Sequence, residues 1–209
     1  MKYFWINLDN AETRREKLLN EFKEHGVTEH FRVSAYLSPK DPKRYKENAC
    51  ARSHIQAITH FLLNTNDECA LICEDDLTFE CKPYWISTVE EVVQHAPPDW
   101  GILQLATIIQ NIEPKFGDRE LYFKWRDQKS SACLAYVIKR KCAIELVNMY
   151  LRESNIYQPP TPDCFSNGIY QRVDRFTKFV SYTYKYPMFV YPDENDTQLD
   201  NSLDLHVAC

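Results

Sequence analysis

The chain has 209 residues, of which 44% are hydrophobic and 26% are charged, and its formal net charge is −5 at neutral pH. That length buries a full core without any Pro, Gly or Ser-rich linker, so we expect a single domain, and the mild acidity argues against nucleic acid or an anionic membrane as the main partner. Glycine occurs only at positions 26, 101, 117 and 168, which excludes both a G-x-G-x-x-G dinucleotide site and a P-loop.

In chain order, the apolar pattern alternates strands with helices. Aromatic, β-branched and apolar runs predict five strands, at residues 2–8, 30–36, 70–74, 100–108 and 131–139. Helical spacing of apolar residues predicts four helices, at residues 10–26, 49–64, 84–96 and 141–152. Asn10 is the expected N-cap of the first helix and Gly26 its end, while Pro97 and Pro98 stop the third helix. This alternation predicts a layered α/β fold with a mostly parallel sheet.

The N-terminus, MKYFWINLDNAETRREK, has too few apolar residues for a signal-peptide core or a membrane span. We therefore expect a cytoplasmic protein with no transmembrane segment, whose eight cysteines are reduced thiols. Cysteines with apolar neighbours are expected to be buried, and these are Cys50, Cys133 and Cys142. The spacing of Cys69, Cys73 and Cys81 lacks the paired C-x-x-C of a zinc site.

The strand at 70–74 leads directly into three consecutive carboxylates, Glu74, Asp75 and Asp76. On an extended chain, side chains 74 and 76 point the same way about 6.6 Å apart, twice the rise per residue. At an effective dielectric constant near 20, two negative charges at that separation repel each other by roughly 2.5 kcal/mol. No Lys or Arg lies between Asp67 and Lys82. We therefore expect either a divalent cation or a distant basic side chain at this corner, unless the triplet is simply a solvated loop or helix cap.

A hard cation, Mn²⁺ or Mg²⁺, fits carboxylate ligands best. In α/β sheets, ligands collect beyond the carboxyl ends of the strands, and the triplet lies at such an end. Because the chain cannot build a glycine-rich phosphate cradle, the ion itself would neutralise a diphosphate. Nucleotide-sugar transferases use a metal ion in this way, because the ion stabilises the departing nucleotide.

Five segments, in order along the chain, resemble family 25 of the glycosyltransferases, the lipopolysaccharide-type sugar transferases related to collagen galactosyltransferases. The segments are INLDNAETRREKL, ENACARSHIQAI, ALICEDD, AYVIKRKCAIEL and PTPDCF. They are similar, respectively, to the family's opening strand and helix, its Gly-Cys-x-x-Ser-His helix, its Leu-Glu-Asp-Asp metal strand, its Tyr-hydrophobic-Ser-Arg-x-Ala segment and its Pro-x-Asp position. The resemblance covers roughly residues 3–204 and implies a GT-A type nucleotide-sugar transferase fold.

The chain departs from the family pattern at three positions, where Ala49 replaces a Gly, Cys73 replaces a Leu and Cys142 replaces a Gly. These departures bear on donor preference and leave the metal chemistry intact. The compact length also resembles single glycosyltransferase domains encoded by large algal viruses. That likeness implies one GT-A domain over residues 1–209, cut from a longer polypeptide and working in the host cytoplasm.

The resemblance also implies a set of donor-binding residues, namely Ile6, Asn7, Leu8, Arg14, Ser53, His54, Asp75 and Gln198. The first three would line the nucleotide base, and Arg14 would approach the base or a phosphate. Two alternatives stay open: Arg14 could be a surface arginine paired with Glu12 or another acid, and His54 could be a satisfied core histidine. Gln198 belongs to a polar segment that could close over the donor or be a solvated tail.

The expected metal ligands are Asp76, Glu74 on the same side of the strand, and His206 near the C-terminus. If the reaction inverts the anomeric centre, Asp163 would be the base that takes the proton of the acceptor hydroxyl. The expected catalytic residues are therefore Asp163, as this base, and Asp76, as the ligand of the metal ion. If configuration is retained, Asp163 would only orient the acceptor. The alternatives are a frayed terminal histidine at 206 and a turn-forming aspartate at 163.

A long polar and aromatic segment at 115–131 is expected to be a loop, in which Tyr122, Phe123 and Trp125 would stack on an acceptor sugar or cover the core.

Together these features predict an enzyme, a glycosyltransferase that moves a hexose or deoxyhexose from a UDP-sugar to a hydroxyl of a glycan or glycoprotein. The alternatives are a metal-dependent phosphoesterase using the same acidic cluster and a carbohydrate-binding module with structural Ca²⁺.

Overall fold

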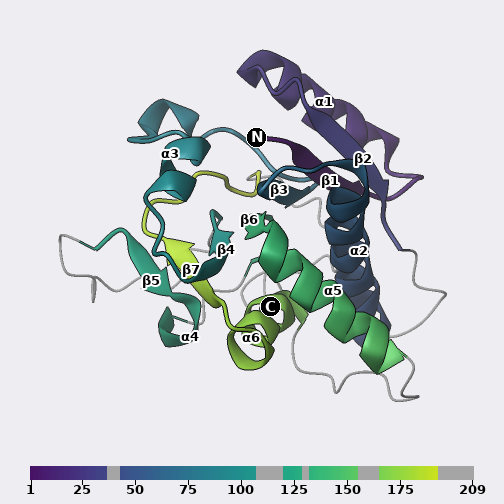
Figure 1. Ribbon diagram of the computed structural model, residues 1–209. Helices are drawn as coiled ribbons and strands as arrows, with labels where there is room; N and C mark the ends of the chain where they lie inside the picture. Colours follow the sequence, from purple (N-terminus) through teal and green to yellow (C-terminus); the bar gives the residue numbers. More distant parts are fainter. Residues whose placement is uncertain (37–42, 107–119, 129–131, 155–164, 193–209) are drawn as a thin grey trace.

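The computed structural model describes residues 1–36, 43–106, 120–128, 132–154 and 165–192, and Figure 1 shows their arrangement around a central sheet. The strands are β1 (Tyr3–Asn7), β2 (His30–Ser34), β3 (Cys69–Glu74), β4 (Trp100–Gln104), β5 (Tyr122–Lys124), β6 (Ala135–Lys139) and β7 (Val180–Tyr184). The helices are α1 (Glu12–His25), α2 (Lys43–Asn64), α3 (Val89–Gln94), α4 (Trp125–Gln128), α5 (Arg140–Ser154) and α6 (Phe165–Phe176), with a 3₁₀ turn, η1 (Lys82–Tyr84).

The seven strands form one mixed sheet in the order β2-β1-β3-β6-β4-β7-β5. Strand β1 pairs parallel with both β2 and β3, and β4 pairs parallel with β7. Strand β6 is antiparallel to both of its neighbours, β3 and β4, and β5 is an antiparallel edge strand. Five strands therefore point the same way, as the predicted α/β fold requires, and their carboxyl ends share one edge of the sheet.

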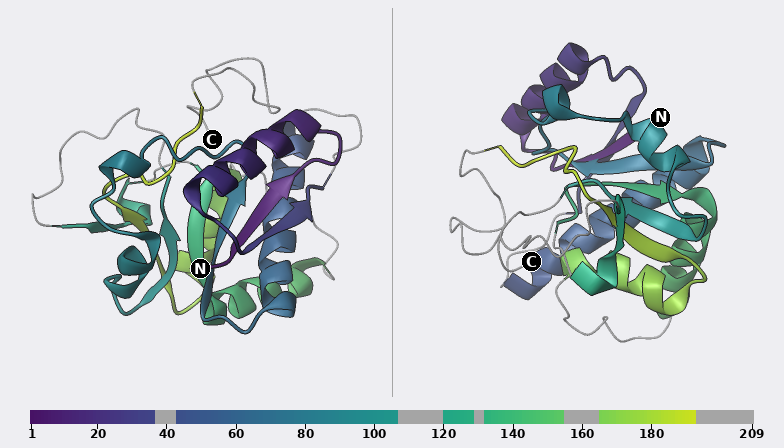
Figure 2. Two further views of the ribbon diagram at one scale, coloured as in Figure 1. Left: turned by 90° about the horizontal axis from the view of Figure 1, so that it is seen from above. Right: turned by 90° about the vertical axis from the view of Figure 1, so that its left-hand side faces the viewer.

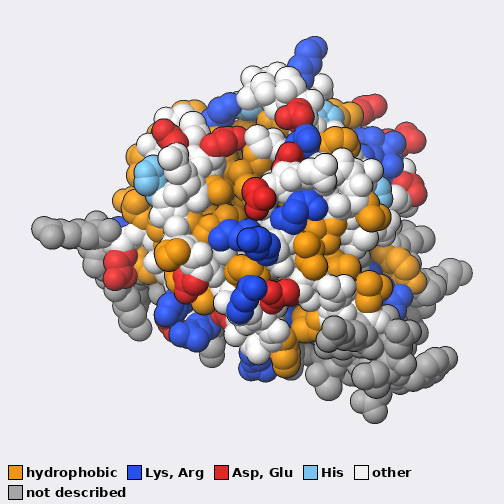
Figure 3. All heavy atoms as spheres, in the orientation of Figure 1, with side chains coloured by type: hydrophobic (Ala, Val, Ile, Leu, Met, Phe, Trp, Pro, Cys, Tyr) orange, Lys and Arg blue, Asp and Glu red, His pale blue; other side chains and the backbone are white. Residues whose placement is uncertain are grey.

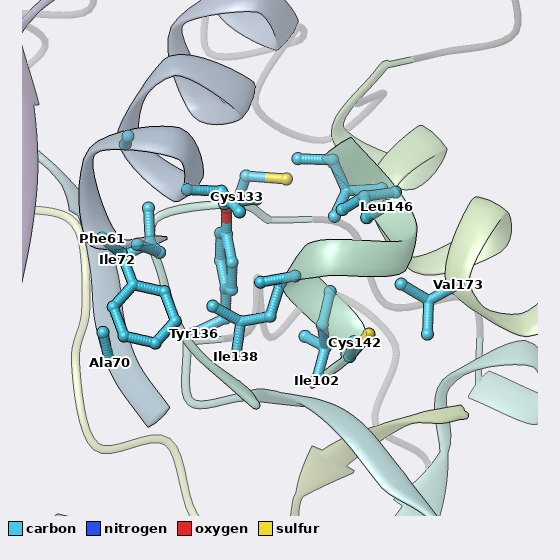
Figure 4. Close-up of a cluster of buried hydrophobic side chains, with 14 of the residues drawn as sticks. Phe61, Ala70, Ile72, Ile102, Cys133, Tyr136, Ile138, Cys142, Leu146 and Val173 are labelled. Carbon is cyan, nitrogen blue, oxygen red and sulfur yellow. The ribbon is translucent and has the colours of Figure 1, made fainter. Parts of the chain in front are cut away.

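Helices cover both faces of the sheet, which gives three layers (Figure 2). On one face, apolar side chains of α2, α5 and α6 pack on the sheet, and on the other face those of α1 and α3 do so. Figure 4 shows part of the first cluster, to which α2 contributes Phe61, β6 contributes Tyr136 and α5 contributes Leu146. Successive side chains of a strand point to opposite faces of the sheet, so each strand contributes alternate residues to the two clusters. Phe4 and Ile72 belong to the first cluster, and Trp5 and Leu71 belong to the second.

Two predicted helix boundaries are corrected by the structure. Helix α1 begins at Glu12, and Ala11 occupies its N-cap without a side-chain hydrogen bond, so Asn10 is not the cap. Gly26 ends α1 as predicted, with a left-handed φ of 74°. The helix predicted at 84–96 contracts to α3, because the hydroxyl of Thr88 accepts from the N–H of Glu91 in a capping box that starts the helix there.

The segment expected to be an acceptor-binding loop is partly a strand. Residues 122–124 form β5, and the next residues form α4. Phe123 and Trp125 are 7% and 5% exposed, so of the two expected roles they have the one in the core and offer little surface on which a sugar could stack. Tyr122 is half-buried, and its hydroxyl donates to the carbonyl of Val92 at 2.7 Å.

Within the described residues, no helix combines the length and the apolar character needed to cross a membrane. On the face shown in Figure 3, acidic and basic side chains are interspersed with apolar ones. The six cysteines in the described ranges are free thiols, in agreement with the prediction of reduced cysteines. Cys133 and Cys142 are buried as expected, and Cys50 is half-buried.

Candidate functional site

Sheet topology brings the predicted site residues of β1 and β3 to one edge, next to the end of β2. Ile6 of β1 lies in register with Glu74 of β3, so the next residues along both strands, Asn7 and Asp75, emerge side by side. Asn7 is also in register with Ser34 at the end of β2. Helix α1 lies above these strands and α2 lies beside them in Figure 1, and Arg14 of α1 and His54 of α2 contact this corner. We call Glu74, Asp75 and Asp76 the carboxylate corner.

Strand β3 ends at Glu74, and Asp75 and Asp76 lie in a turn. The expected extended geometry, with residues 74 and 76 on one side of a strand, is therefore wrong. Because the turn separates the three side chains, each carboxylate meets different partners. Glu74 faces α2, whereas Asp75 and Asp76 face α1.

Arg14 of α1 supplies the counter-charge that the local sequence lacks. Its guanidinium donates from Nη2 to Oδ1 of Asp75 and lies 2.9 Å from Oδ2 of Asp76, and its side chain is only 13% exposed. Arg14 thus pairs with the corner and not with Glu12. Among the described residues, the ion pairs set one arginine, Arg14, against Asp75 and Asp76, with Glu74 beside them, which is a charge balance that suits a further cation.

Asp76 offers the atom best placed to bind that cation. Its Oδ2 pairs with Arg14, while its Oδ1 is buried and has no hydrogen-bond partner among the described residues. A buried carboxylate oxygen without a partner is costly unless something binds it. Burial, with the charge of Glu74, raises the pKa of Asp76 to about 7, although Arg14 opposes the shift. A divalent ion bound at Oδ1 would satisfy this oxygen and stabilise the charged form, so the residues present fit a metal ion.

Asn7 holds the corner to its neighbours. Its amide nitrogen donates to Oδ2 of Asp75 at 2.6 Å and to the carbonyl of Ala11 at 3.1 Å. Its amide oxygen accepts from Arg15 at 3.1 Å and from Arg32 at 2.9 Å. The side chain is buried and its hydrogen-bonding groups are engaged by the protein, so Asn7 positions Asp75 within the site.

The two flanking residues expected to line a nucleotide base occupy different surroundings. Ile6 is 7% exposed and packs in the core cluster under α2. Leu8 is half-buried at the turn after β1, where its carbonyl accepts from the N–H of Ala11 at 3.0 Å. Beside this turn, Asp9 pairs with Arg32 at 2.5 Å and accepts from the hydroxyl of Ser34 at 2.8 Å.

Helix α2 contributes a second group of polar side chains, on the far side of Glu74. His54 is buried, with Nε2 3.0 Å from Oε1 of Glu74 and Nδ1 3.2 Å from the hydroxyl of Tyr136. The thiol of Cys50 lies 3.7 Å from the same Glu74 oxygen. The candidate ligand atoms of Cys50, His54 and Glu74 all lie within 4.8 Å of one another, close enough to hold one metal ion.

The pKa of Glu74 reflects this contact. Burial works against the charged carboxylate, but the hydrogen bond and charge of His54, together with Arg14, outweigh it and lower the pKa. Glu74 is therefore ionised where Asp76, by its raised pKa, is partly protonated near neutral pH. Within the described residues, a histidine lies beside Glu74 and not beside Asp76, and this accounts for the difference between the two carboxylates.

The hydroxyl of Ser53 forms hydrogen bonds that connect two parts of the fold. Its hydroxyl donates to the carbonyl of Ala49 at 2.8 Å and accepts from the N–H of Tyr36 at 2.8 Å. The side chain is 2% exposed, so it ties the end of β2 to α2. The remaining predicted site residues, Asp163, Gln198 and His206, lie outside the described residues.

Sequence reasoning did not single out Tyr136 or Arg32 as part of this corner. Tyr136 lies in the middle of an apolar strand, where an aromatic residue signals only the core. Arg32 lies in a strand remote from the triplet, and only the parallel pairing of β1 with β2 brings it to Asn7. The resemblance between AYVIKRKCAIEL and its family segment was the one signal that touched Tyr136.

Comparison with solved structures supports the fold assignment. A glycosyltransferase involved in the glycosylation of the major capsid of PBCV-1 superimposes with a TM-score of 0.56 at 10% identity, covering 100% of this chain and 98% of that one. The apo-form glycosyltransferase GlyE of Streptococcus pneumoniae TIGR4 gives a TM-score of 0.50 at 8% identity, with 94% of this chain and 56% of that one covered. The chain thus spans about half the length of GlyE.

No protein-family model and no curated protein sequence matches the chain. The comparisons therefore support a glycosyltransferase fold without pointing to family 25. The mixed seven-stranded sheet, flanked by helices on both faces, is a GT-A type fold.

Proposed function

We propose that the protein is a metal-dependent glycosyltransferase that moves a hexose or deoxyhexose from a UDP-sugar donor to a hydroxyl of a glycan or glycoprotein acceptor. The observation that supports this best is the buried Oδ1 of Asp76, which no group in the described part of the chain hydrogen-bonds, at the carboxyl-end edge of a GT-A type sheet. In such sheets, ligands bind beyond the carboxyl ends of the strands. The glycosylation role of the viral neighbour makes a protein-linked glycan a fitting acceptor.

In this proposal, Asp76 and Glu74 hold a Mn²⁺ or Mg²⁺ ion, which supplies neutralisation of the donor diphosphate and of the departing nucleotide. Arg14 lies next to that place and would face the same phosphates while it keeps Asp75 paired. Asn7 holds Asp75, which in turn fixes the direction of Arg14. These residues bind and orient the donor.

The other proposed contributions come from residues outside the described part of the chain. His206 would complete the metal ligands, and Gln198 would contact the donor. Asp163 would take the proton of the acceptor hydroxyl if the transfer inverts the anomeric centre, or orient the acceptor if it retains configuration.

A donor screen tests the function. Each UDP-sugar is incubated with the protein and Mn²⁺, and slow hydrolysis is scored as released UDP. We expect one donor to be hydrolysed, and we expect Asp76→Asn to lower that rate about 100-fold or more, because metal ions contribute several kcal/mol to such reactions. Asp127→Asn is the matched control, since that carboxylate lies on α4 with a side chain 65% exposed.

Cleavage of a simple phosphate ester with no turnover of any UDP-sugar would instead identify a phosphoesterase. Ca²⁺ binding without any nucleotide binding would identify a carbohydrate-binding module.

A further inference from the structure

We propose a second metal site, for Zn²⁺ or a similar transition-metal ion, formed by Cys50, His54 and Glu74 on the α2 side of the carboxylate corner. The site shares Glu74 with the proposed one at Asp76 but lies on the other side of that carboxylate, and it does not require that the protein transfers sugars. Its chemistry differs because it offers one sulfur, one nitrogen and one oxygen, a donor set that favours zinc over Mg²⁺, Ca²⁺ or Mn²⁺.

The positions of the three ligands on α2 and at the end of β3 bring their side chains together. Cys50 and His54 are four residues apart on α2, so both side chains project from one face of the helix toward the end of β3. Glu74, the last residue of β3, meets them there. His60, which is exposed, belongs to another face of α2 and takes no part.

The distances match a tetrahedral ion. Zinc binds nitrogen and oxygen at about 2.0 Å and sulfur at about 2.3 Å, so two neighbouring ligand atoms around it lie about 3.3–3.6 Å apart. In the structure, His54 Nε2 lies 3.0 Å and Cys50 Sγ 3.7 Å from Oε1 of Glu74, and all three ligand atoms lie within 4.8 Å of one another. The two contacts to Glu74 are thus within a few tenths of an ångström of the tetrahedral values, and the Cys50 and His54 side chains would close on the ion as it binds. The thiol would release its proton to water as the sulfur binds.

Tyr136 gives the site a supporting contact. Metal-bound histidines usually use their second ring nitrogen to hydrogen-bond an oxygen, which fixes the ring and its tautomer. The hydroxyl of Tyr136 lies 3.2 Å from Nδ1 of His54, and this leaves Nε2 directed at Glu74 and Cys50. Tyr136 is buried in the core, so its hydroxyl is held rigidly where the histidine needs it.

The local charge also favours a second cation. Arg14 forms its ion pairs with Asp75 and Asp76, whereas the contacts of the Glu74 carboxylate within the described residues come from His54 and Cys50. A carboxylate has two oxygens and can serve two ions at once, so Glu74 could contact zinc on its α2 side and the ion at Asp76 on the other. Zinc at this place would tie α2 to β3 and fix the position of Glu74.

Cobalt titration of the metal-free, full-length protein tests the proposal without any nucleotide. We expect Co²⁺ to produce a thiolate-to-cobalt charge-transfer band and the intense visible bands of a four-coordinate ion, and we expect Zn²⁺ to displace them. Cys50→Ser should remove the charge-transfer band, and Cys81→Ser should retain it. Tyr136→Phe should keep the band but weaken zinc binding about 10- to 100-fold, the usual effect of losing such a supporting contact.

The same titration separates this site from the proposed donor site. Asp76→Asn should abolish the Mn²⁺-dependent donor chemistry and leave the cobalt spectrum intact, because Asp76 is not a ligand of the second ion. A charge-transfer band that survives Cys50→Ser, or that disappears in Asp76→Asn while circular dichroism shows a folded protein, would overturn the proposal.

A measurement on the unmodified protein covers the case in which Cys50→Ser fails to fold. Zn²⁺ should slow the alkylation of Cys50 by iodoacetamide at least about tenfold, as read by mass spectrometry of the peptides, and leave the rate at Cys81 unchanged. Equal slowing at both cysteines, or no slowing at Cys50, would show that zinc does not bind there.

Discussion

At the scale of single residues, the corner depends on pairs that are distant in sequence. Arg14 reaches Asp75 and Asp76 from the first helix, across about sixty residues of chain. The acidic triplet itself is visible in the sequence, and so is the need for a counter-charge. Which of the 25 lysines and arginines supplies it depends on how α1 packs beside β3, and no local pattern encodes that packing.

Asn7 is expected to be a major contributor to stability. Replacing it in Asn7→Ala would remove hydrogen bonds to Ala11, Asp75, Arg15 and Arg32 and leave buried polar groups without partners. We expect the free energy of unfolding to fall by about 3 kcal/mol, as measured by urea denaturation. The matched control is Asn64→Ala on the exposed end of α2, expected to stay within about 0.5 kcal/mol. Similar losses in both variants would contradict the role given to Asn7.

Asp76 should make the metal-free protein less stable as pH rises. Burial and Glu74 raise its pKa to about 7 from an ordinary value of 3.8, so the folded state holds a proton that the unfolded state releases between these values. Stability falls with pH wherever the folded state binds more protons, hence from about pH 4 to about pH 7. The decline should be smaller in Asp76→Asn, which has no proton to lose. Urea midpoints across this range, in the presence of a chelator, measure the difference between the two proteins, and identical pH profiles would contradict the assignment.

At the scale of elements, the sequence predicts what is local and repetitive. The strands at β1, β2, β3, β4 and β6 and the helices α1, α2 and α5 have strong periodic patterns, and the structure confirms them within a few residues. β5 has three residues, too short to show a period, and its aromatic residues suggested a sugar-binding loop. The antiparallel direction of β6 is invisible locally, because a buried strand has the same apolar pattern in either direction.

At Gly101 of β4, the packing leaves no space for a side chain, and this explains why a glycine occupies a strand position. A Cβ atom there would lie 2.5 Å from Cβ of Phe179 and 2.7 Å from Sγ of Cys142, so the strand and α5 approach too closely for any side chain. Gly101→Ala should therefore cost about 2–3 kcal/mol of unfolding free energy, since overpacked cores must shift their backbone.

Gly26→Ala offers a matched comparison. Its added Cβ meets no atom within 4 Å, and only the left-handed φ of 74° opposes the change. We expect a smaller cost of about 1 kcal/mol there. Thermal denaturation of the two variants checks the order, and an equal or larger loss at Gly26 would contradict the packing argument.

At the scale of the whole molecule, the direction of the strands decides where chemistry is possible. Because β1, β2 and β3 run parallel, their last residues meet at one edge, and α1 and α2 bring Arg14 and His54 to the same place. The sequence could place the triplet at a strand end and associate it with a cation. It could not show that a turn sends Glu74 toward one helix and the two aspartates toward another, since this follows from packing on both faces of the sheet.

The most direct test of the proposed function is a calorimetric titration of UDP into the protein, with and without Mn²⁺. We predict tight binding only with the metal, loss of that binding in Asp76→Asn, and unchanged binding in Asp127→Asn, with the same circular dichroism spectrum for all three proteins. UDP binding that is equally strong in the presence of a chelator, or that persists in Asp76→Asn, would contradict a metal ion held between the carboxylate corner and a nucleotide diphosphate.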